Sequence, residues 1–527
     1  MVIQHRYKSP SGKVQQAQQL ENLYAKCPLF RARNPSILSS RQRLPPRWKP
    51  ANCRKYTLPS ANVKCRACAD SRFSSTSPSK HSHKPNNEEN FLSERTMLQI
   101  HGGKRLEGEV KVSGAKNAAL AIQAGCLLCE QPMVLHNVPD LVDVANMGEV
   151  LQSVGASVER DGHDSNSLVL NCSELTSSSP SLESVVKLRA SFLVIGPLLA
   201  RNGETSVPLP GGCAIGARPV NLHIRGLEAL GAKVEVKDGV VHATVGPEGT
   251  LRGSRVYLEY PSVGATETVI MAAVVAEGET VIENVAQEPE IVDLANFLVS
   301  VGARIRGAGT KVITIQGVRS LHGGEYTVIP DRVEAGTLLV SAAITYSNLW
   351  LSSIVPAHLT SIVTKLEETG CQIKFKDDNR LELIPPPELL STDIRTLPYP
   401  GFPTDMQAQF MALLTVAKGP SVVQETVFEG RMAHALELQQ MGARLSVAES
   451  TAFLEGIQED HGGLQGASVA GSDLRGTAAL VLAGLAAEGI TKVQGLQHLD
   501  RGYDKLDQKL RSIGASVERI SMDNAKD

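Results

Sequence analysis

Twelve residues, PLPGGCAIGARP at Pro208–Pro219, place a thiol in a segment whose composition favours a loop. Cys213 stands among glycines, which disfavour helices and strands because they lose the most conformational freedom on ordering. Cysteine is usually buried, so a cysteine in such a loop points to chemistry. Arg218, five residues further on, would lower the pKa of the thiol and make it more reactive. The alternative is a small residue that the loop merely tolerates.

A second candidate is the segment VSGAKNAAL at Val112–Leu120. Ser113 and Gly114 precede a run of strong helix formers, and Lys116 falls in the predicted first turn. A lysine there opposes the positive end of the helix dipole, which makes sense if an anion binds at the same place. An exposed surface lysine is the alternative. The segment is not a P-loop, because Gly-Lys-Ser/Thr is absent.

Asp405 is the candidate general base, in the segment YPGFPTDMQAQF where a helical pattern begins. A carboxylate at such a turn can accept a proton from a substrate, or it can cap the helix, as Thr404 also can. Arginines in other polar turns could converge on a multiply charged anion, because guanidinium groups bind carboxylate and phosphate bidentately. Taken singly, each is better explained as a surface ion pair. They are Arg189, Arg431, Arg475 and Arg501.

The elements that must position these residues follow from a repeat. A helix–glycine–strand pattern recurs six times, 68 to 76 residues apart, and fills nearly all of residues 95–525. A fixed period is a stronger fold signal than local propensity. Each copy predicts an amphipathic helix that ends at its glycine, because glycine adopts the left-handed conformation without strain. The six glycines are Gly155, Gly231, Gly302, Gly370, Gly442 and Gly514.

Alternating residues after each glycine, as in AKVEVKDG, predict a strand, and segments such as SLVLNC and SRVYLEY add others. The fold class is therefore α/β, with at least one helix covering a small sheet in each unit. The units could form one array or two groups of three. The segment IPDRVEAG at Ile329–Gly336 lies midway and is the expected seam. An all-helical solenoid conflicts with the strands between the helices.

Composition separates a tail from this body. Residues 1–87 contain 17 Lys or Arg but only two acidic residues, and the rest of the 527-residue chain carries a net charge of −17. This asymmetry predicts a separable basic extension and not a nucleic-acid-binding face. Low hydrophobicity predicts disorder, and an acid-poor composition with Ser and Arg is typical of an organellar transit peptide. A disordered tail without a targeting role is the alternative.

Cysteine usage and hydropathy exclude several classes of protein. The nine cysteines include two CxxC pairs, CRAC and CLLC, which stand far apart and predict neither a zinc site nor a disulfide framework. The second pair lies in an apolar helical pattern, where thiols act as small buried hydrophobes. The longest apolar run, Ala478–Ala487, is too short for a membrane span. No apolar stretch near Met1 predicts a secretory signal.

Together these motifs resemble those of the UDP-N-acetylglucosamine enolpyruvyl transferase family. They occur in family order over about residues 97–520 and include GEVKVSGAKNAAL, LPGGCAIGARPVNLHI, PSVGATET, EPEIVDLANFL, PDRVEAGT, FPTDMQAQF, ETVFEGR, SDLRG and DRGYDKL. The resemblance implies a two-domain inside-out α/β barrel with three repeats in each domain. Residues 95–115 plus 330–522 would form one domain and 116–329 the other, with 1–94 as the extension. The site would lie between the domains and close on substrate.

The resemblance implies that the enolpyruvyl group of phosphoenolpyruvate is transferred to the 3′-hydroxyl of UDP-N-acetylglucosamine, with release of phosphate. Cys213 would protonate the methylene carbon of phosphoenolpyruvate, and Asp405 would take the proton of the sugar hydroxyl. The implied catalytic residues are Cys213, Asp405, Lys116 and Arg501. Those implied to bind phosphoenolpyruvate are Lys116, Asn117, Arg218, Arg431 and Arg501. Those implied to bind the nucleotide sugar are Asn117, Arg189, Arg218, Pro219, Val220, Asn221, Leu222, His223, Ser262, Val263, Gly264, Asp405 and Val427.

Two departures from the family pattern fall in the nucleotide-sugar region. Asn221 stands where well-known bacterial members have aspartate, and Tyr260-Pro261 stands where some have Lys-Val. They bear on single contacts and not on the reaction. One alternative is the sister transferase that acts on shikimate 3-phosphate, which lacks the GGCAIGARP loop. The other is a catalytically inactive relative that serves as a binding or scaffold protein, against which the intact Cys213 and Asp405 argue.

The resemblance also implies the partners of the chain. They are the two small-molecule substrates, with no metal or organic cofactor, no nucleic acid and no membrane, and the protein is expected to be a monomer. A cysteine at position 213 implies inactivation by fosfomycin, which alkylates that thiol in the family. The transit-like extension predicts a location in the plastid (chloroplast) stroma, with mitochondrial import as the less favoured option.

Overall fold

A computed structural model of the chain describes residues 96–162, 164–210, 220–246, 249–457 and 463–522. All of the described residues belong to one compact unit within residues 82–527. The predicted extension at 1–94 therefore lies outside the described residues. No helix among the described residues is long and apolar enough to cross a membrane.

Six helices end at the six repeated glycines, as predicted. Each of these glycines has a φ between 90° and 109°, the left-handed region in which a side chain would be strained. A strand begins two or three residues after each glycine. The helices are α4 (Val142–Gln152), α7 (Asn221–Ala229), α9 (Pro289–Ser300), α11 (Thr360–Glu368), α13 (His434–Gln440) and α16 (Leu506–Ser512). The strands are β4 (Ser157–Arg160), β7 (Lys233–Lys237), β11 (Arg304–Arg306), β15 (Gln372–Asp377), β19 (Leu445–Ala448) and β23 (Ser516–Ser521).

Each of these strands forms the edge of one of six small sheets in the described residues. In β15-β16-β14-β2 the first two neighbour pairs are antiparallel and the last pair is parallel, and four other sheets share this order. The sixth, β6-β8-β7, has three described strands. Six equivalent sheets confirm the six α/β units. The other strands are β2 (Gly108–Lys111), β3 (Met133–His136), β5 (Leu168–Asn171), β6 (Glu204–Pro208), β8 (Val240–Thr244), β9 (Arg255–Tyr257), β10 (Glu279–Glu283), β12 (Val312–Gln316), β13 (Gly324–Thr327), β14 (Leu349–Ser352), β16 (Arg380–Ile384), β17 (Ile394–Arg395), β18 (Ser421–Gln424), β20 (Thr451–Leu454), β21 (Ser468–Ala470) and β22 (Ile490–Gln494).

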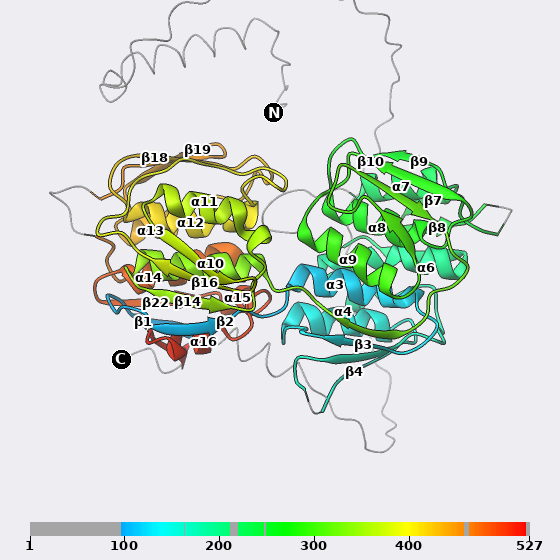
Figure 1. Cartoon of the computed structure of the whole chain (residues 1–527), viewed down its shortest axis with the longest axis horizontal. Helices are drawn as coiled ribbons and strands as arrows, with labels where there is room; N and C mark the ends of the chain where they lie inside the picture. Colours follow the sequence, from blue (N-terminus) through cyan, green and yellow to red (C-terminus); the bar gives the residue numbers. More distant parts are fainter. Residues whose placement is uncertain (1–95, 163, 211–219, 247–248, 458–462, 523–527) are drawn as a thin grey trace, which may run out of the picture. The chain divides into compact units, whose positions relative to one another are not determined.

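The last repeat is completed by the first described strand. β1 (Thr96–His101) lies between β22 and β23 and is antiparallel to both. Thr96 pairs with Ser521, so the two ends of the repeat array meet within one sheet. In Figure 1 the blue strand β1 accordingly lies among the orange and red elements of the last repeat.

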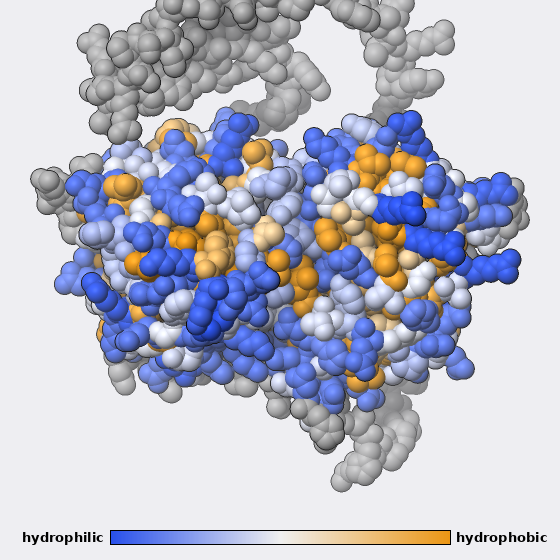
Figure 2. Space-filling view, viewed as in Figure 1, coloured by the Kyte–Doolittle hydropathy of each residue, from blue (hydrophilic) through white to orange (hydrophobic). Residues whose placement is uncertain are grey.

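The buried side chains form two separate hydrophobic clusters. One draws on residues 98–112 and 333–517 around α10 (Arg332–Ile344), α12 (Gln407–Thr415) and α14 (Leu474–Ala486). The other draws on residues 115–328 around α3 (Lys116–Gly125), α6 (Ile195–Asn202) and α8 (Val263–Ala273). These six helices are buried on nearly all sides, as expected for apolar helices at the centre of a layered fold. On the face seen in Figure 2, hydrophobic residues form small groups among hydrophilic ones.

The chain passes between the two clusters twice, and the two passages pair with each other. Gly114 and Pro330 form an antiparallel bridge. The Ala115 amide donates to the Ile329 carbonyl at 2.7 Å, and the Asp331 amide donates to the Ser113 carbonyl at 2.8 Å. The expected seam at IPDRVEAG thus coincides with the second passage.

Gly114 is required at this crossing by close packing. A Cβ added there would lie 1.7 Å from the carbonyl oxygen of Asn137, far inside contact distance. We expect Gly114→Ala to lower the free energy of unfolding by about 1–3 kcal/mol, as other overpacking substitutions do. Urea unfolding of the full chain would measure this. Gly162→Ala is the matched control, because a Cβ there meets nothing within 4 Å. Equal stability of the two variants would contradict the prediction.

Candidate active site

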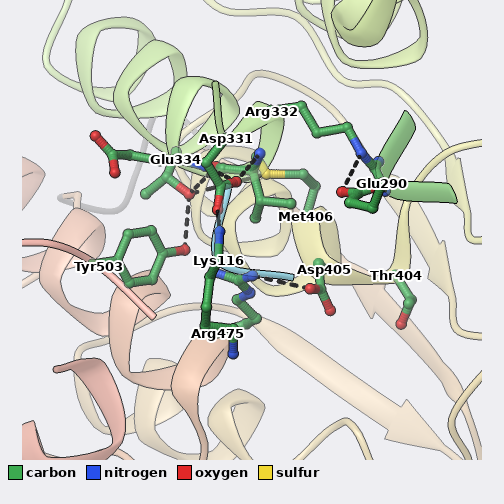
Figure 3. A network of polar contacts seen from close by, with 12 residues as sticks. Lys116, Glu290, Asp331, Arg332, Glu334, Thr404, Asp405, Met406, Arg475 and Tyr503 are labelled. Atoms are coloured by element: carbon green, nitrogen blue, oxygen red, sulfur yellow. Dashed lines mark hydrogen bonds and ion pairs between the residues drawn. The ribbon is translucent and has the colours of Figure 1, made fainter. Parts of the chain in front are cut away.

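Asp405 lies in a buried ion-pair cluster with two of the predicted arginines. It stands in the short 3-10 helix η5 (Thr404–Met406) that leads into α12. Its Oδ1 is 2.8 Å from Arg431 Nη1. Its Oδ2 is 3.0 Å from Arg475 Nη2 (Figure 3). Neither Asp405 nor Thr404 caps the helix through its side chain, so the capping interpretation is wrong.

The Asp405 carboxyl is held in its ionised form. Burial raises its pKa, but the charges of Arg475 and Arg431 and their hydrogen bonds outweigh burial and hold the pKa well below its usual range. A carboxylate in this state can accept a proton, although two guanidinium groups reduce its basicity. General-base work at Asp405 therefore requires these pairs to loosen when a ligand binds.

A buried hydrogen-bond network lies next to Arg475 and holds Tyr503, on whose ring Arg475 packs. The Arg475 guanidinium lies 5.1 Å from the ring centre of Tyr503. The Gln409 amide donates to the Asp405 carbonyl at 2.8 Å and to the Tyr503 hydroxyl at 3.1 Å, and Thr337 Oγ1 is 2.9 Å from that hydroxyl. Figure 3 shows Tyr503 and Asp405 on either side of Arg475. Within the described residues, Arg475 Nη1 and Arg431 Nε are buried without a hydrogen-bond partner. Each arginine therefore keeps one donor that no acceptor in the described residues uses.

Glu425 organises the turn next to Asp405. Its buried carboxylate accepts hydrogen bonds from the hydroxyls of Thr396 and Thr404, each at 2.8 Å. It also accepts from the amides of Val427 at 2.7 Å and Phe428 at 3.1 Å. The predicted contact residue Val427 is thus held by a carboxylate that sequence reasoning did not single out.

Lys116 and Arg501, both predicted to bind phosphoenolpyruvate, meet at one carboxylate. Lys116 Nζ is 3.1 Å from Asp143 Oδ2, and Arg501 Nε is 2.8 Å from Asp143 Oδ1. Lys116 is the first residue of α3, as predicted, and Asp143 lies in the first turn of α4. Arg501 lies in the turn between the short helix α15 (Leu496–Leu499) and α16.

The N-terminus of α3 already holds an anion from the protein itself. The Lys116 amide donates to Asp331 Oδ2 at 3.2 Å. Asp331 Oδ1 also accepts from the amides of Val333 at 2.8 Å and Glu334 at 3.1 Å, and so caps α10. One buried carboxylate therefore satisfies the first turns of two helices.

Part of the predicted nucleotide-sugar set lies around the start of α8. Ser262 caps this helix through its hydroxyl, and Val263 and Gly264 form its first turn. A Cβ on Gly264 would lie 3.0 Å from His223 Cε1, so the two residues are in close contact. His223 Nδ1 is hydrogen-bonded to Thr268 Oγ1 at 2.9 Å, and its ring packs edge-on against Phe192.

The remaining predicted contacts are spread over several elements. Arg189 begins the 3-10 helix η3 (Arg189–Val194), and its charge acts on His223. Asn117 is exposed in the first turn of α3. Val220 precedes α7, whose first two residues are Asn221 and Leu222. Cys213, Arg218 and Pro219 lie outside the described residues.

Thiols and metal ligands elsewhere add no further centre. Cys126, Cys129, Cys172 and Cys371 are buried and free, and burial raises the pKa of Cys129 to about 12. Across the described ranges, no three His, Cys, Asp or Glu side chains are grouped so as to hold a metal ion. The CLLC pair thus behaves as the small hydrophobes that the sequence predicted.

Sequence reasoning missed three carboxylates that organise the site, Asp143, Asp331 and Glu425. Each is buried although acidic side chains normally face solvent. Asp331 and Glu425 stand inside two quoted motifs, PDRVEAGT and ETVFEGR. Their position there was a usable signal. Asp143, in LVDVANM, gave no such signal, because the sequence shows only an acidic residue in a predicted first helical turn.

Comparisons with known proteins show the family of the chain. The family model for EPSP synthase (3-phosphoshikimate 1-carboxyvinyltransferase) matches residues 100–510. The chain belongs to this carboxyvinyltransferase family. It is 54% identical over 426 residues to a UDP-N-acetylglucosamine 1-carboxyvinyltransferase of Nostoc sp., covering 81% of this chain and 94% of that one. It is 52% identical over 423 residues to UDP-N-acetylglucosamine 1-carboxyvinyltransferase 2 of Carboxydothermus hydrogenoformans, covering 80% and 99%.

Solved structures of the family share the fold. The enolpyruvyl transferase NikO from Streptomyces tendae matches with a TM-score of 0.72 at 25% identity, over 81% of this chain and 99% of that one. An EPSP synthase from Acinetobacter baumannii matches with a TM-score of 0.63 at 18% identity, over 81% and 100%. The predicted enolpyruvyl transferase fold is therefore confirmed.

The environment of His223 predicts a pH dependence of stability. Burial and the charge of Arg189 lower its pKa to about 4. Because the folded pKa lies below the unfolded value of about 6.5, His223 contributes stability above pH 6.5 that is lost as the pH falls towards 4. We expect His223→Gln to lose less stability than the wild type between pH 7.5 and 4.5, by up to about 3 kcal/mol. Urea unfolding at both pH values would measure this, and equal losses would contradict it.

Proposed function

We propose that this chain transfers the enolpyruvyl group of phosphoenolpyruvate to the 3′-hydroxyl of UDP-N-acetylglucosamine, the first committed step of peptidoglycan precursor synthesis. The observation that carries this assignment is the 54% identity to a UDP-N-acetylglucosamine 1-carboxyvinyltransferase over 94% of its length. The arrangement of Asp405, Arg431 and Arg475 supports this assignment. An ionised carboxylate lies beside two guanidinium groups, each of which keeps one nitrogen without a hydrogen-bond partner among the described residues. Such a cluster suits a reaction in which a hydroxyl group of one substrate gives up its proton and the other substrate is an anion.

In the proposed reaction the sugar oxygen bonds to C2 of phosphoenolpyruvate while C3 gains a proton from Cys213. Asp405 accepts the proton of the sugar hydroxyl. The tetrahedral adduct then loses a proton from C3 and expels phosphate from C2, which restores the double bond. Phosphoenolpyruvate and UDP-N-acetylglucosamine thus give the enolpyruvyl nucleotide sugar and inorganic phosphate, and no redox change occurs.

Cations surround the expected position of the anionic donor. We assign the carboxylate and phosphate of phosphoenolpyruvate to Lys116, Asn117, Arg218, Arg431 and Arg501. Fixed positive charges stabilise the adduct as well as the substrate, and they act strongly where water is excluded. The ion pairs at Asp143 and at Asp405 support this assignment, because Lys116, Arg431 and Arg501 keep N–H donors that these carboxylates do not use.

The nucleotide sugar is assigned to residues at the start of three helices, α3, α7 and α8, and in the Glu425 turn. Asp331 already accepts the first amide of α3 and Ser262 caps α8, whereas α7 has no side-chain cap, so the amides at the start of α7 are the ones that favour a diphosphate. Pairing of His223 with Thr268 and its contact with Gly264 support a preformed wall for this ligand. The assigned residues are Asn117, Arg189, Arg218, Pro219, Val220, Asn221, Leu222, His223, Ser262, Val263, Gly264, Asp405 and Val427.

The domain division follows the two hydrophobic clusters. We assign residues 95–115 plus 330–522 to one domain and 116–329 to the other. The separate clusters and the paired crossing at Gly114 and Pro330 support this division. The protein is proposed to act as a monomer.

The assay that tests the function is phosphate release by the full chain. We expect release that requires both phosphoenolpyruvate and UDP-N-acetylglucosamine, and a loss of at least about 100-fold in Cys213→Ala if the thiol is the general acid. Preincubation with fosfomycin should give a similar loss, because it alkylates the same thiol. Shikimate 3-phosphate is the control acceptor. Release with that acceptor alone would reassign the substrate, and no release from folded protein would favour a scaffold role.

We propose that residues 1–94 direct the protein to the plastid stroma. Their basic, acid-poor composition supports import, and high identity to a relative from Synechocystis sp. fits an organelle of cyanobacterial origin. A fluorescent protein fused behind residues 1–95 should accumulate in plastids. Fluorescence that stays in the cytosol would contradict the proposal, and mitochondrial fluorescence would favour the second option.

A further inference from the structure

The Asp143 carboxylate is the point at which two cations of the proposed phosphoenolpyruvate site converge. We propose that Asp143 is a positioning residue for that site. It holds Lys116 and Arg501 at a fixed separation and orients the guanidinium towards the donor substrate. This inference rests on the proposed function and adds a residue to which no role has been given in binding or catalysis.

The geometry divides the carboxylate evenly between the two cations. Oδ2 faces Lys116 Nζ at 3.1 Å, and Oδ1 faces Arg501 Nε at 2.8 Å. The side chain of Asp143 is only 3% exposed, and that of Lys116 is 12% exposed. Two like charges so close together repel each other strongly away from water. A shared buried carboxylate offsets that repulsion, and without it Arg501, which is 40% exposed, is free to swing away.

The two cations lie beside different hydrophobic clusters. Lys116 begins α3 beside the second cluster, whereas Arg501 lies 358 residues after Asp143 in sequence, next to the first. Asp143 therefore joins a cation of one cluster to a cation of the other. A site that needs both charges depends on this junction.

The contacts that Asp143 makes leave the ligand-binding atoms unused. It engages Arg501 through Nε, and among the described residues no acceptor is paired with the two terminal nitrogens of that guanidinium. Those terminal nitrogens form the edge that binds phosphate or carboxylate with two parallel hydrogen bonds. The Lys116 ammonium likewise has three donors and, within the described part of the chain, one acceptor, Asp143.

An opposite interpretation makes Asp143 a substitute anion that the substrate must displace. The structure disfavours it, because a buried side chain in the first turn of α4 has little freedom to withdraw and the terminal nitrogens need no release. The two interpretations predict opposite changes in KM. Loss of a positioning carboxylate raises the KM for phosphoenolpyruvate, whereas loss of a competitor lowers it.

The test compares Asp143→Asn with Asp140→Asn in the full chain. Asp140 makes an ion pair of similar type with Lys505 at 3.3 Å, but both side chains are more than half exposed and neither touches Lys116 or Arg501. We expect Asp143→Asn to raise the KM for phosphoenolpyruvate about tenfold or more, as for loss of a hydrogen bond between charged groups. The KM for UDP-N-acetylglucosamine should change less than about twofold. Asp140→Asn should leave both constants within about twofold.

A KM for phosphoenolpyruvate that stays within twofold of wild type, or falls, in folded Asp143→Asn would overturn the inference. Thermal unfolding of each variant verifies folding. If Asp143→Asn does not fold, Arg501→Lys provides the test at a more exposed position. A lysine cannot offer the ligand a planar edge of two nitrogens while a third nitrogen binds Asp143, as a guanidinium does, so the same rise in KM is expected despite the retained charge. An unchanged KM there would also overturn it. Absence of phosphate release by the wild type would instead refute the proposed function.

Discussion

The carboxylate of Asp331 is the interaction on which the arrangement of the described residues most depends. It is 7% exposed and accepts three backbone amide hydrogen bonds, one from α3 and two from α10. These helices belong to different hydrophobic clusters and start at the two paired passages of the chain. A negative charge at two positive helix ends stabilises both termini at once. The relative direction of the two helices is thereby tied to a single side chain.

Residues next to this junction extend the link between the clusters. Arg332, which follows Asp331, pairs with Glu290 of α9 at 3.0 Å, and its side chain is only 11% exposed. The Glu334 carboxylate accepts the Ser113 amide at 3.2 Å and also contacts the Lys509 ammonium. Buried ion pairs of this kind contribute little net stability, because desolvation opposes their attraction, but they penalise any arrangement that separates the partners. They thus specify one geometry more than they stabilise it.

The same principle governs the candidate active site. Asp143 and Asp405 each lie between two cations, so the site assembles positive charge without leaving it uncompensated. The anionic partners take only some of the available donors. If this site binds a substrate with two anionic groups, as proposed, the substrate would meet cations that the protein already positions, and little ordering entropy would remain to be lost on binding.

Local signals made much of this predictable. The six glycines and the start of α3 at Lys116 follow from propensity and capping rules that act within a few residues. The burial of Asp143 was not predictable, because it depends on Arg501, 358 residues away. The capping interpretation of Asp405 was wrong for the same reason, since distant arginines occupy its oxygens. Such contacts follow from how the repeats are arranged in space, which a local pattern does not encode.

The pairing of β1 with β22 and β23 has a consequence for the order in which the molecule can be built. A chain made on a ribosome, or threaded through a translocation pore, presents Thr96 early and Ser521 last. The cluster formed by residues 115–328 is contiguous and can assemble while later residues are still emerging. The other cluster has to wait for the final strand, so β1 spends the whole interval as an unpaired edge. Any factor that protects the nascent or translocating chain would therefore be needed longest at β1, the first strand of the described fold to emerge.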